Sequence, residues 1–200
     1  MTVTTRVVLA SHNTHKLEEL RRILAPVVPG IELVGYDGPE PVESGVTFEE
    51  NALLKARAAA SHTGLPALAD DSGISVAVLG GSPGIFSARW AGPARSNEAN
   101  VELLLWQLGD LADEHRGAAF VCAAALATPD GIERVVRGEW AGSILRQPAG
   151  AGGFGYDPVF QPVGEARSAA ELSPAEKDAA SHRRRAFTAL APELQKLSSK

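Results

Sequence analysis

The 200-residue sequence has a single cysteine, no long hydrophobic run and no internal repeat. One cysteine, Cys122, excludes a disulfide framework within the chain. The apolar residues around it, 120–125, favour a buried and inert thiol over a nucleophile. No run approaches the roughly 18 apolar residues of a transmembrane helix, and no signal-peptide pattern opens the chain. We therefore expect a cytoplasmic protein that does not bind membranes.

Excess positive charge is missing as well. The formal net charge is −5, from 19 Lys and Arg against 24 Asp and Glu. This balance argues against a general nucleic-acid or membrane-surface binder. A polyanion would have to be bound locally, by a few placed cations and a metal. The length and the 44% hydrophobic content are those of an ordinary globular domain, so we expect a single domain over residues 1–200.

Hydrophobic periodicity predicts both strands and helices. Strands are expected at residues 7–10, 31–34, 118–127, 132–136 and 140–145. Helices are expected around residues 17–24, 47–60, 101–108, 173–180 and 187–197, with Pro192 kinking or interrupting the last. Strands alternate with helices early in the chain and form hairpins later. The fold class predicted is therefore α/β with a mixed sheet.

A polar segment follows the first predicted strand and consists of Ser11, His12, Asn13, Thr14, His15 and Lys16. A helix that begins near Asn13 or Thr14 leaves its first N–H groups unpaired. These donors, the helix dipole and Lys16 can together hold a phosphate. The alternative is that Asn13 or Thr14 only caps the helix and Lys16 is solvated. The segment is not a P-loop, because it lacks the glycine-rich run before Lys.

The sequence Asp70-Asp71-Ser72-Gly73 lies between two apolar runs. One interpretation is a tight turn, since Asp, Ser and Gly all favour turns. The other is a metal site, because adjacent carboxylates repel unless a cation lies between them and an anionic ligand. Mg²⁺ binds through one or two carboxylates and substrate phosphates. Glu43, in a turn-like segment, is a candidate for a further carboxylate.

The glycine-rich stretch at residues 150–158 is the most unusual in the chain. Four glycines in six residues let the backbone approach a flat or crowded ligand closely. Phe154 and Tyr156 in this loop are candidates for stacking on a base. The alternative is a flexible flap whose aromatic rings pack on the core.

A basic group near the C-terminus comprises Lys177, His182 and Arg183. On one unbroken helix Lys177 and His182 would point to different sides. Ser181 therefore caps a new helix in this interpretation, and the preceding turn brings the three side chains together. The alternative is a solvated basic helix face, which we accept for Arg184 and Arg185.

Together the four segments supply a phosphate cradle, metal carboxylates, a base-stacking loop and a basic clamp, the parts of a nucleoside triphosphate site. Their order resembles that of the inosine/xanthosine triphosphate pyrophosphatase family (HAM1 or RdgB-type house-cleaning enzymes). The motifs that carry the resemblance are Ser11-x-Asn13-x-x-Lys16, residues 47–56, 69–73, 80–89 and 152–158, and Ser181-His182-Arg183. They span nearly the whole chain. Trp90 stands where tyrosine is expected, and Pro192 departs from the pattern of the last helix.

The resemblance implies a twisted mixed sheet flanked by helices, in an elongated two-lobed single domain with the site in its cleft. It implies a homodimer that uses Mg²⁺ to hydrolyse ITP, dITP or XTP to the monophosphate and pyrophosphate. It assigns the triphosphate to the segment from Ser11 to Lys16, the catalytic role to Asp71, and the metal to Glu43 and Asp71. The remaining substrate contacts it implies are Ser72, Phe154, Gly155, Tyr156, Asp157, Lys177, His182 and Arg183.

Base selection follows from hydrogen bonding. Hypoxanthine and xanthine carry an oxygen at the 6-position, where adenine carries an amino group, so a site with donors there disfavours adenine. His182 and Arg183 are the candidate donors. Two other functions stay open: a catalytically silent nucleotide-binding module, and a pyrophosphatase acting on ordinary or modified pyrimidine nucleotides.

Overall fold

The computed structural model describes residues 4–198, apart from the side chain of His15. Its sheet has the order β2-β1-β3-β4-β5-β6. The strands are β1 (Thr5–Leu9), β2 (Ile31–Val34), β3 (Ala67–Val76), β4 (Gly117–Ala127), β5 (Glu133–Ile144) and β6 (Phe160–Pro162). Strand β1 is parallel to β2 and β3, whereas β5 and β6 are antiparallel. The predicted mixed α/β sheet is thus confirmed.

Five α-helices accompany the sheet within the described part of the chain. They are α1 (Thr14–Leu24), α2 (Phe48–Thr63), α3 (Asn97–Gln107), α4 (Pro174–Ala180) and α5 (His182–Ser198). Short 3₁₀ turns lie at Ala77–Leu79, Gly84–Arg89, Asp113–His115, Asp157–Val159 and Ala169–Glu171. Among the helices of residues 4–198, none has both the length and the hydrophobicity needed to cross a bilayer.

The chain forms two compact units and passes between them four times. The first unit comprises the residues up to Asp71, Cys122–Gly138 and the residues from Arg183 onward. The second comprises Ser72–Val121 and Glu139–His182. Both units are therefore discontinuous in sequence, and the single two-lobed domain expected over residues 1–200 stays a prediction.

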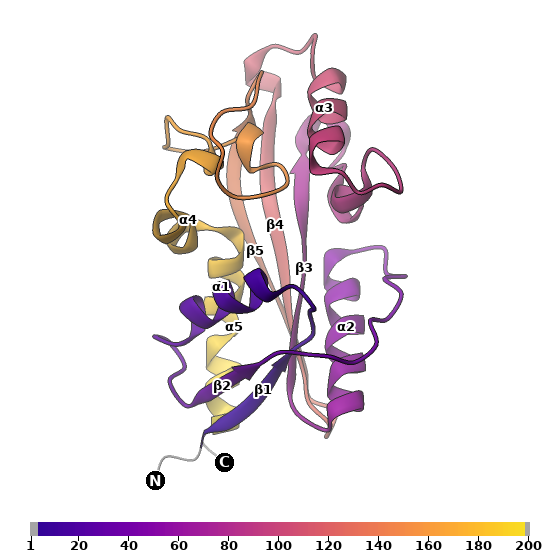
Figure 1. The fold of residues 1–200 in the computed structure, drawn as a ribbon, viewed down its shortest axis with the longest axis vertical. Helices are drawn as coiled ribbons and strands as arrows, with labels where there is room; N and C mark the ends of the chain where they lie inside the picture. The colour runs from indigo at the N-terminus through magenta and orange to yellow at the C-terminus, as the bar shows by residue number, and fades with distance from the viewer. Residues whose placement is uncertain (1–3, 199–200) are drawn as a thin grey trace. The chain divides into compact units, whose positions relative to one another are not determined.

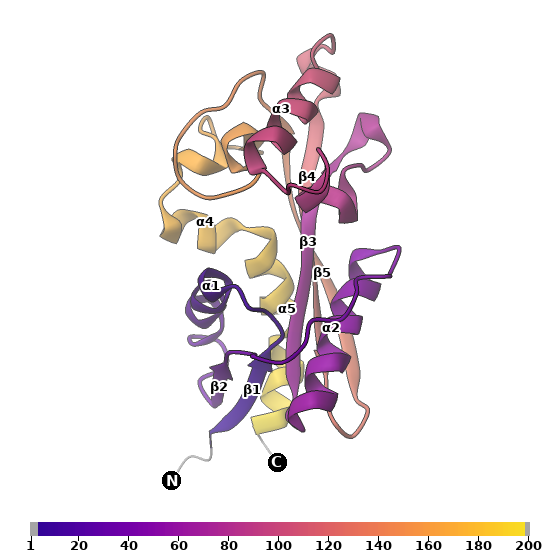
Figure 2. The same cartoon turned by 45° about the vertical axis from the view of Figure 1, so that its right-hand side comes forward.

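The core of the first unit lies on both faces of its strands. One face carries larger side chains, among them Val7, Leu68 and Leu126, and packs against leucines of α1 and α5. The other face is lined by alanines such as Ala123, and α2 buries the alanines Ala52, Ala56, Ala59 and Ala60. Figures 1 and 2 show α1 and α5 on one side of these strands and α2 on the other. Small residues on both surfaces let α2 approach closely.

The second unit has its own core, built around aromatic side chains. Phe160 lies edge-on to Phe120 and to Trp140, at centroid distances of 4.6 and 5.5 Å. Val101 and Leu104 of α3 belong to the same cluster. These contacts fix the strands that precede and follow the glycine-rich loop.

Helix capping was read correctly from the sequence. Thr47 Oγ1 accepts from the Glu50 N–H at the start of α2, and α4 begins with a complete capping box formed by Ser173 and Glu176. Helix α4 ends at Ala180, Ser181 is extended, and α5 begins at His182, as the predicted helix break requires.

Three local expectations were wrong, wholly or in part. The turn considered at residues 70–73 does not form, because β3 runs without a break from Ala67 to Val76. The strand expected separately at 140–145 is the second half of β5. Helix α5 continues through Pro192, so of the two expected effects the interruption is absent, while a kink stays a prediction. At residues 70–73 and at Pro192, burial of the flanking apolar residues outweighs the local turn or breaker preference.

Candidate active site

The polar segment after β1 forms the N-terminus of α1. Asn13 is the N-cap, and its Oδ1 accepts from the Lys16 N–H at 3.2 Å. Ser11 Oγ accepts from the Asn13 N–H at 3.2 Å, which shapes the approach to the helix. Asn13 therefore caps the helix, as the alternative predicted, but Lys16 is not solvated as that alternative also required, because it pairs with Asp70. The N–H groups of Thr14 and His15 lie at the positive end of the helix dipole. The first turn holds no acidic residue that would offset this positive potential.

Lys16 belongs to a buried group of alternating charges. Its Nζ lies 2.8 Å from Asp70 Oδ1. The other oxygen of Asp70 accepts from Arg183 Nε at 3.2 Å, and Arg183 Nη1 donates to Glu19 Oε2 at 3.1 Å. Glu19 and Lys16 are three residues apart on α1, so they lie on the same side of the helix. The group thus ties α1, β3 and α5 together.

The charges of this group shift the pKa values of its members. Burial alone would raise the pKa of Asp70, but Lys16, Arg183 and Lys55 outweigh it and hold that pKa far below the usual range. Burial likewise opposes the charge of Arg183, yet Asp70 and Glu19 raise its pKa above normal. These neighbouring cations therefore favour the ionised form of Asp70 in the folded protein, and its charge has a structural role.

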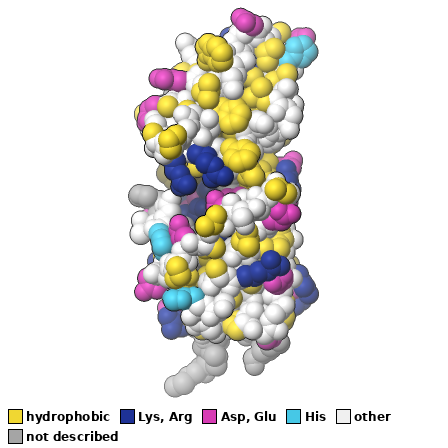
Figure 3. All heavy atoms as spheres, turned by 90° about the vertical axis from the view of Figure 1, so that its right-hand side faces the viewer, with side chains coloured by type: hydrophobic (Ala, Val, Ile, Leu, Met, Phe, Trp, Pro, Cys, Tyr) yellow, Lys and Arg dark blue, Asp and Glu magenta, His cyan; other side chains and the backbone are white. Residues whose placement is uncertain are grey.

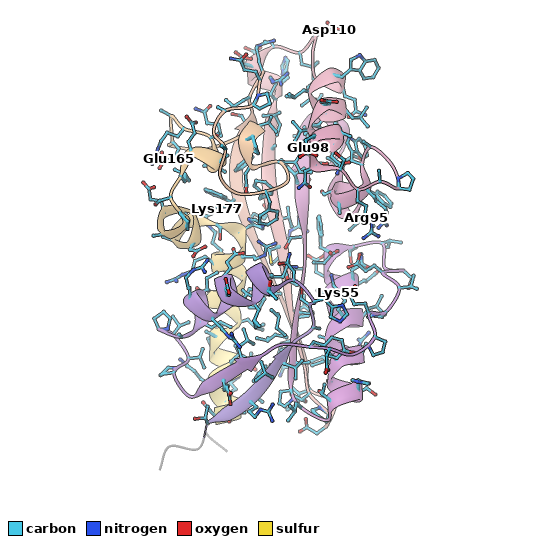
Figure 4. All side chains as sticks on the ribbon, in the orientation of Figure 1. Lys55, Arg95, Glu98, Asp110, Glu165 and Lys177 are labelled. Carbon is cyan, nitrogen blue, oxygen red and sulfur yellow. The ribbon has the colours of Figure 1, made fainter. Side chains whose placement is uncertain are left out.

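Asp71 belongs to a second polar group, around α2. Its Oδ1 lies 3.3 Å from Lys55 Nζ, and its Oδ2 accepts from Asn51 Nδ2 at 3.2 Å. Lys55 Nζ also donates to Glu43 Oε1, at 2.6 Å. Asn51 Oδ1 accepts from the Gly45 N–H at 2.9 Å, which holds the segment that carries Glu43. Two carboxylates therefore converge on the single ammonium group of Lys55, which stands on α2 (Figure 4).

Asp71 is less well compensated than Asp70. Burial raises its pKa, and although Lys55 and Asn51 lower it, the nearby Glu43 and Asp70 add to the rise. For Lys55, burial works to lower the pKa, but Asp71, Asp70 and Glu43 raise it above normal. A partly buried carboxylate with a raised pKa beside a fixed cation is a favourable starting point for a general base.

The two adjacent aspartates do not share one cation. Successive side chains of a strand point to opposite faces, so Asp70 faces Lys16 and Arg183 whereas Asp71 faces Asn51 and Lys55. The expectation that the pair converges on one metal was therefore wrong. Strand β3 is continuous here, so the two carboxylates stay on opposite faces. Glu43 and Asp71 are the carboxylates that come together.

The glycine-rich loop is organised by Asp157. Its Oδ2 accepts from the Phe154 N–H at 2.7 Å and also pairs with Lys177 Nζ. Lys177, on α4 (Figure 4), lies 4.9 Å from the centroid of the Phe154 ring. Gly153 and Gly155 have positive φ angles, and a Cβ at Gly153 would clash with the Asp157 carboxylate.

The two aromatic residues of the loop differ. Phe154 is 56% exposed, whereas Tyr156 is 5% exposed and donates from its hydroxyl to the Ser87 carbonyl at 2.9 Å. Burial also raises the pKa of Tyr156. Tyr156 thus follows the alternative in which the ring packs on the core, and only Phe154 presents its ring to solvent.

The other predicted site residues have these surroundings. His182 is buried and stacks on Phe120 with ring centroids 5.0 Å apart. Ser72 is half-buried on β3. His12 turns its ring nitrogens to Gly38 and Glu40. His15 lies in α1, but its side chain is outside the described residues. Direct contact of these residues with a substrate stays a prediction.

Sequence reasoning assigned no role to Asn51, Lys55 or Glu19. A signal was present, because Asn51 and Lys55 are four residues apart on a helix whose buried face is otherwise largely alanine. A polar pair at helical spacing on such a face indicates partners across it. Glu19, three residues after Lys16, offered the same kind of signal.

Fold and site together define a class: a mixed-sheet α/β protein in which a helix N-terminus and a lysine adjoin buried carboxylate groups, as suits a phosphorylated ligand. The chain belongs to the Ham1 family, whose model matches residues 7–193.

Individual relatives match over almost their whole length. A protein of Leifsonia xyli named dITP/XTP pyrophosphatase is 58% identical, with 96% of this chain and 97% of that protein covered. One of the same name from Mycobacterium tuberculosis is 55% identical over 100% of both chains. Among solved structures, a HAM1 protein from Coxiella burnetii has a TM-score of 0.88 and 41% identity, covering 96% of this chain and 100% of its own.

Proposed function

We propose that the protein hydrolyses noncanonical purine nucleoside triphosphates (ITP, dITP and XTP) to the monophosphate and pyrophosphate. The observation that carries the proposal is the convergence of Glu43 and Asp71 on Lys55, in the same unit as the α1 N-terminus. Relatives that cover this chain almost completely are named dITP/XTP pyrophosphatase, which supports the same activity here.

The carboxylates of Glu43 and Asp71 fit a divalent cation. Their oxygens already meet at one positive charge, the Lys55 ammonium. Within the described side chains no group of three or more His, Cys, Asp or Glu is placed to hold a metal. Mg²⁺ requires no such cage, because it takes one or two carboxylates and completes its shell with phosphate oxygens and water. When bound it would neutralise part of the triphosphate charge.

The chain's own residues account for the other parts of the reaction. The N–H groups at the start of α1 and the Lys16 ammonium bind phosphate oxygens and stabilise the charge that develops on the leaving pyrophosphate. Asp71 orients the attacking water and accepts its proton, since its raised pKa makes it a better base than an ordinary aspartate. Lys55 holds Asp71 and Glu43 in place and limits the repulsion between them.

The test is a substrate panel. Pyrophosphate and orthophosphate release are measured for ITP, dITP, XTP, GTP, ATP, dCTP and dUTP, with and without Mg²⁺. The proposal expects Mg²⁺-dependent pyrophosphate release from the first three nucleotides, with much slower release from the others. Orthophosphate as the product, or pyrimidine nucleotides as the best substrates, would contradict it. Nucleotide binding without turnover would identify a silent binding module.

Phe154 is proposed to stack on the purine base. Its exposed ring lies beside Lys177, and a stacked base contributes about 1–3 kcal/mol. We expect Phe154→Ala to raise the KM for ITP roughly tenfold or more, with kcat changed less. The matched control is Phe86→Ala, since Phe86 is 49% exposed and also lies beside a cation, Arg89. Equal KM values in the two variants would exclude stacking on Phe154.

His182 and Arg183 are proposed to select the base by donating to its 6-oxo group. Both side chains are 5% exposed, and Arg183 already binds Asp70 and Glu19. A base would therefore meet fixed donors rather than mobile ones, which favours discrimination. The comparison of ITP with ATP and GTP in His182→Ala and Arg183→Ala checks this role.

The protein is further proposed to be a homodimer that works in the cytoplasm, where free nucleotides are found. Among the described residues, the large hydrophobic side chains that are about half exposed or more, besides Phe154, are Val42, Val46, Val78, Phe86, Trp106 and Val163, and single exposed residues of this kind do not define an interface. On the face drawn in Figure 3, hydrophobic side chains are scattered among polar and charged ones. Light scattering coupled to size exclusion gives the mass that decides between monomer and dimer.

A further inference from the structure

His12 lies inside the phosphate-binding segment, but its side chain contacts a different part of the first unit. Its Nε2 lies 2.9 Å from the Gly38 carbonyl oxygen, and its Nδ1 lies 3.4 Å from Glu40 Oε1. The Gly38 carbonyl can only accept, so the contact with it requires the tautomer that carries its hydrogen on Nε2. Both ring nitrogens therefore contact the segment that follows β2.

Stacked rings reinforce this contact. The His12 ring is nearly parallel to that of Tyr36, at a centroid distance of 5.9 Å, and His62 of α2 meets Tyr36 edge-on at 5.8 Å. The Tyr36 hydroxyl donates to the Pro39 carbonyl at 3.0 Å, which closes the turn. A Cβ at Gly38 would lie 2.5 Å from the Tyr36 hydroxyl and 2.6 Å from the His62 ring. Tyr36 and Gly38 are thus buried beside the His12 and His62 rings, whereas Asp37, Pro39 and Glu40 are exposed.

The two segments joined by His12 carry different parts of the proposed chemistry. Ser11 and Asn13, on either side of it, shape the N-terminus of α1. Residues 36–40 lead directly to Glu43, whose carboxylate meets Lys55 at 2.6 Å. No regular secondary structure holds residues 35–47, so their position depends on side-chain contacts such as these.

We propose that His12 is a positioning residue, which holds the segment bearing the metal carboxylate Glu43 against the phosphate-binding segment, rather than a residue that contacts the substrate. The metal half of this inference rests on the proposed function. The tie itself does not, because it is a contact between two segments of the free protein. Loss of His12 loosens residues 36–43 and weakens Mg²⁺ binding without removing any group from the triphosphate.

The test compares His12→Ala and His12→Gln with His115→Ala, a matched control in which an exposed histidine lies 3.6 Å from an exposed glutamate, Glu114. For each protein, kcat, the KM for ITP at saturating Mg²⁺ and the Mg²⁺ concentration at half-maximal pyrophosphate release are measured. Amide hydrogen exchange over residues 36–43 is followed in the same samples without nucleotide.

For His12→Ala we expect a roughly three- to tenfold higher Mg²⁺ requirement, the scale of one or two weak polar contacts, and faster exchange at residues 36–43. The kcat at saturating Mg²⁺ should stay within about twofold of wild type. His12→Gln, which keeps a donor for the Gly38 carbonyl, should recover part of the loss. His115→Ala should change neither quantity.

Two results would overturn the proposal. A higher KM for ITP at saturating Mg²⁺, with the Mg²⁺ requirement unchanged, would make His12 a substrate contact. Exchange at residues 36–43 no faster than in His115→Ala would show that the tie does not hold the segment. If the wild-type protein releases no pyrophosphate from ITP, the proposed function fails, and the exchange measurement alone decides on the tie.

Discussion

Asp71→Asn should reduce kcat for pyrophosphate release from ITP by about 10²–10⁴-fold. Asparagine has nearly the same shape, but it cannot accept a proton and carries no charge for a metal. Asn51 and Lys55 remain in place around it, so binding of ITP should largely persist. Initial rates and calorimetric ITP binding, measured on the same preparation, separate the loss of chemistry from the loss of binding.

The matched control is Asp110→Asn, a change at an exposed aspartate just beyond α3 (Figure 4), which should leave kcat unchanged. Titration with Mg²⁺ then divides the two roles of Asp71. A rate that recovers at high Mg²⁺ indicates a carboxylate that mainly holds the metal, whereas a rate that stays low indicates the base. A variant that keeps more than about a tenth of the wild-type rate at low as well as at high Mg²⁺ would exclude both roles.

The same substitution should not destabilise the fold. The pKa of Asp71 is raised in the folded protein, chiefly by burial, so its ionised form is less favourable there than in the unfolded chain. Removing the charge therefore leaves the melting temperature unchanged or higher. A residue that lowers stability while serving the chemistry is expected at an active site.

The sequence was most informative where local rules act alone. Capping residues such as Thr47 and Ser173 predicted the starts of α2 and α4, and the pattern of hydrophobic residues predicted β1 and β2. Apolar residues three and four apart predicted α1 before any contact was known. Such signals depend on a few neighbouring residues, and tertiary contacts reinforced them.

The site was only partly predictable, because its geometry comes from pairings across the chain. Nothing in Asp70-Asp71 reveals that a continuous strand sends the two carboxylates to opposite faces, one to Lys16 and one to Lys55. Lys16 lies 54 residues before Asp70 in the sequence, and Lys55 lies 16 residues before Asp71. Tyr156 shows the same limit: its aromatic character suggested base stacking, while its burial against Ser87 is a tertiary fact.

The two adjacent aspartates have different partners in the structure and different roles in the proposed mechanism. Asp70 connects α1 and α5 to β3 through Lys16 and Arg183, and so positions the N-terminus of α1, which is proposed to bind phosphate. Asp71 is the next residue of the same strand, and its carboxylate lies on the opposite face of β3. In the proposed mechanism a positioning charge and a reacting charge therefore share a single strand segment.

Removing the charge of Asp70, unlike removing that of Asp71, should lower the stability of the fold, and the effect should be large. Asp70→Asn leaves Lys16 and Arg183 without the carboxylate they share, in a site where Asp70 is 2% exposed. Removing one partner of a buried ion pair costs about 3–5 kcal/mol. We expect a melting temperature lower by roughly 10 °C, since a chain of this size loses about 2–4 °C per kcal/mol. Calorimetry and urea unfolding measure the change.

The control is Glu133→Gln, which removes an ion pair of similar geometry, 2.6 Å from Arg57 Nε, at the exposed surface. Solvent screens such a pair, so its loss should not change the melting temperature measurably. If the two variants unfold alike, then the buried charges of Lys16 and Arg183 find other compensation, and Asp70 does not hold the three elements together.

The stabilisation by Asp70 should depend on pH in a definite direction. The pKa of Asp70 is lowered in the folded state, where Lys16, Arg183 and Lys55 outweigh the opposing effect of burial, while an unfolded aspartate titrates near about 3.9. Its contribution is therefore fully present above that value and is lost as the pH falls below it, because the unfolded chain takes up the proton first. The gap in melting temperature between wild type and Asp70→Asn should be constant from neutral pH to about pH 5 and shrink towards pH 3. A gap that instead widened on acidification would mean that Asp70 is protonated in the folded protein, and the charge group around Lys16 would have to be reassigned.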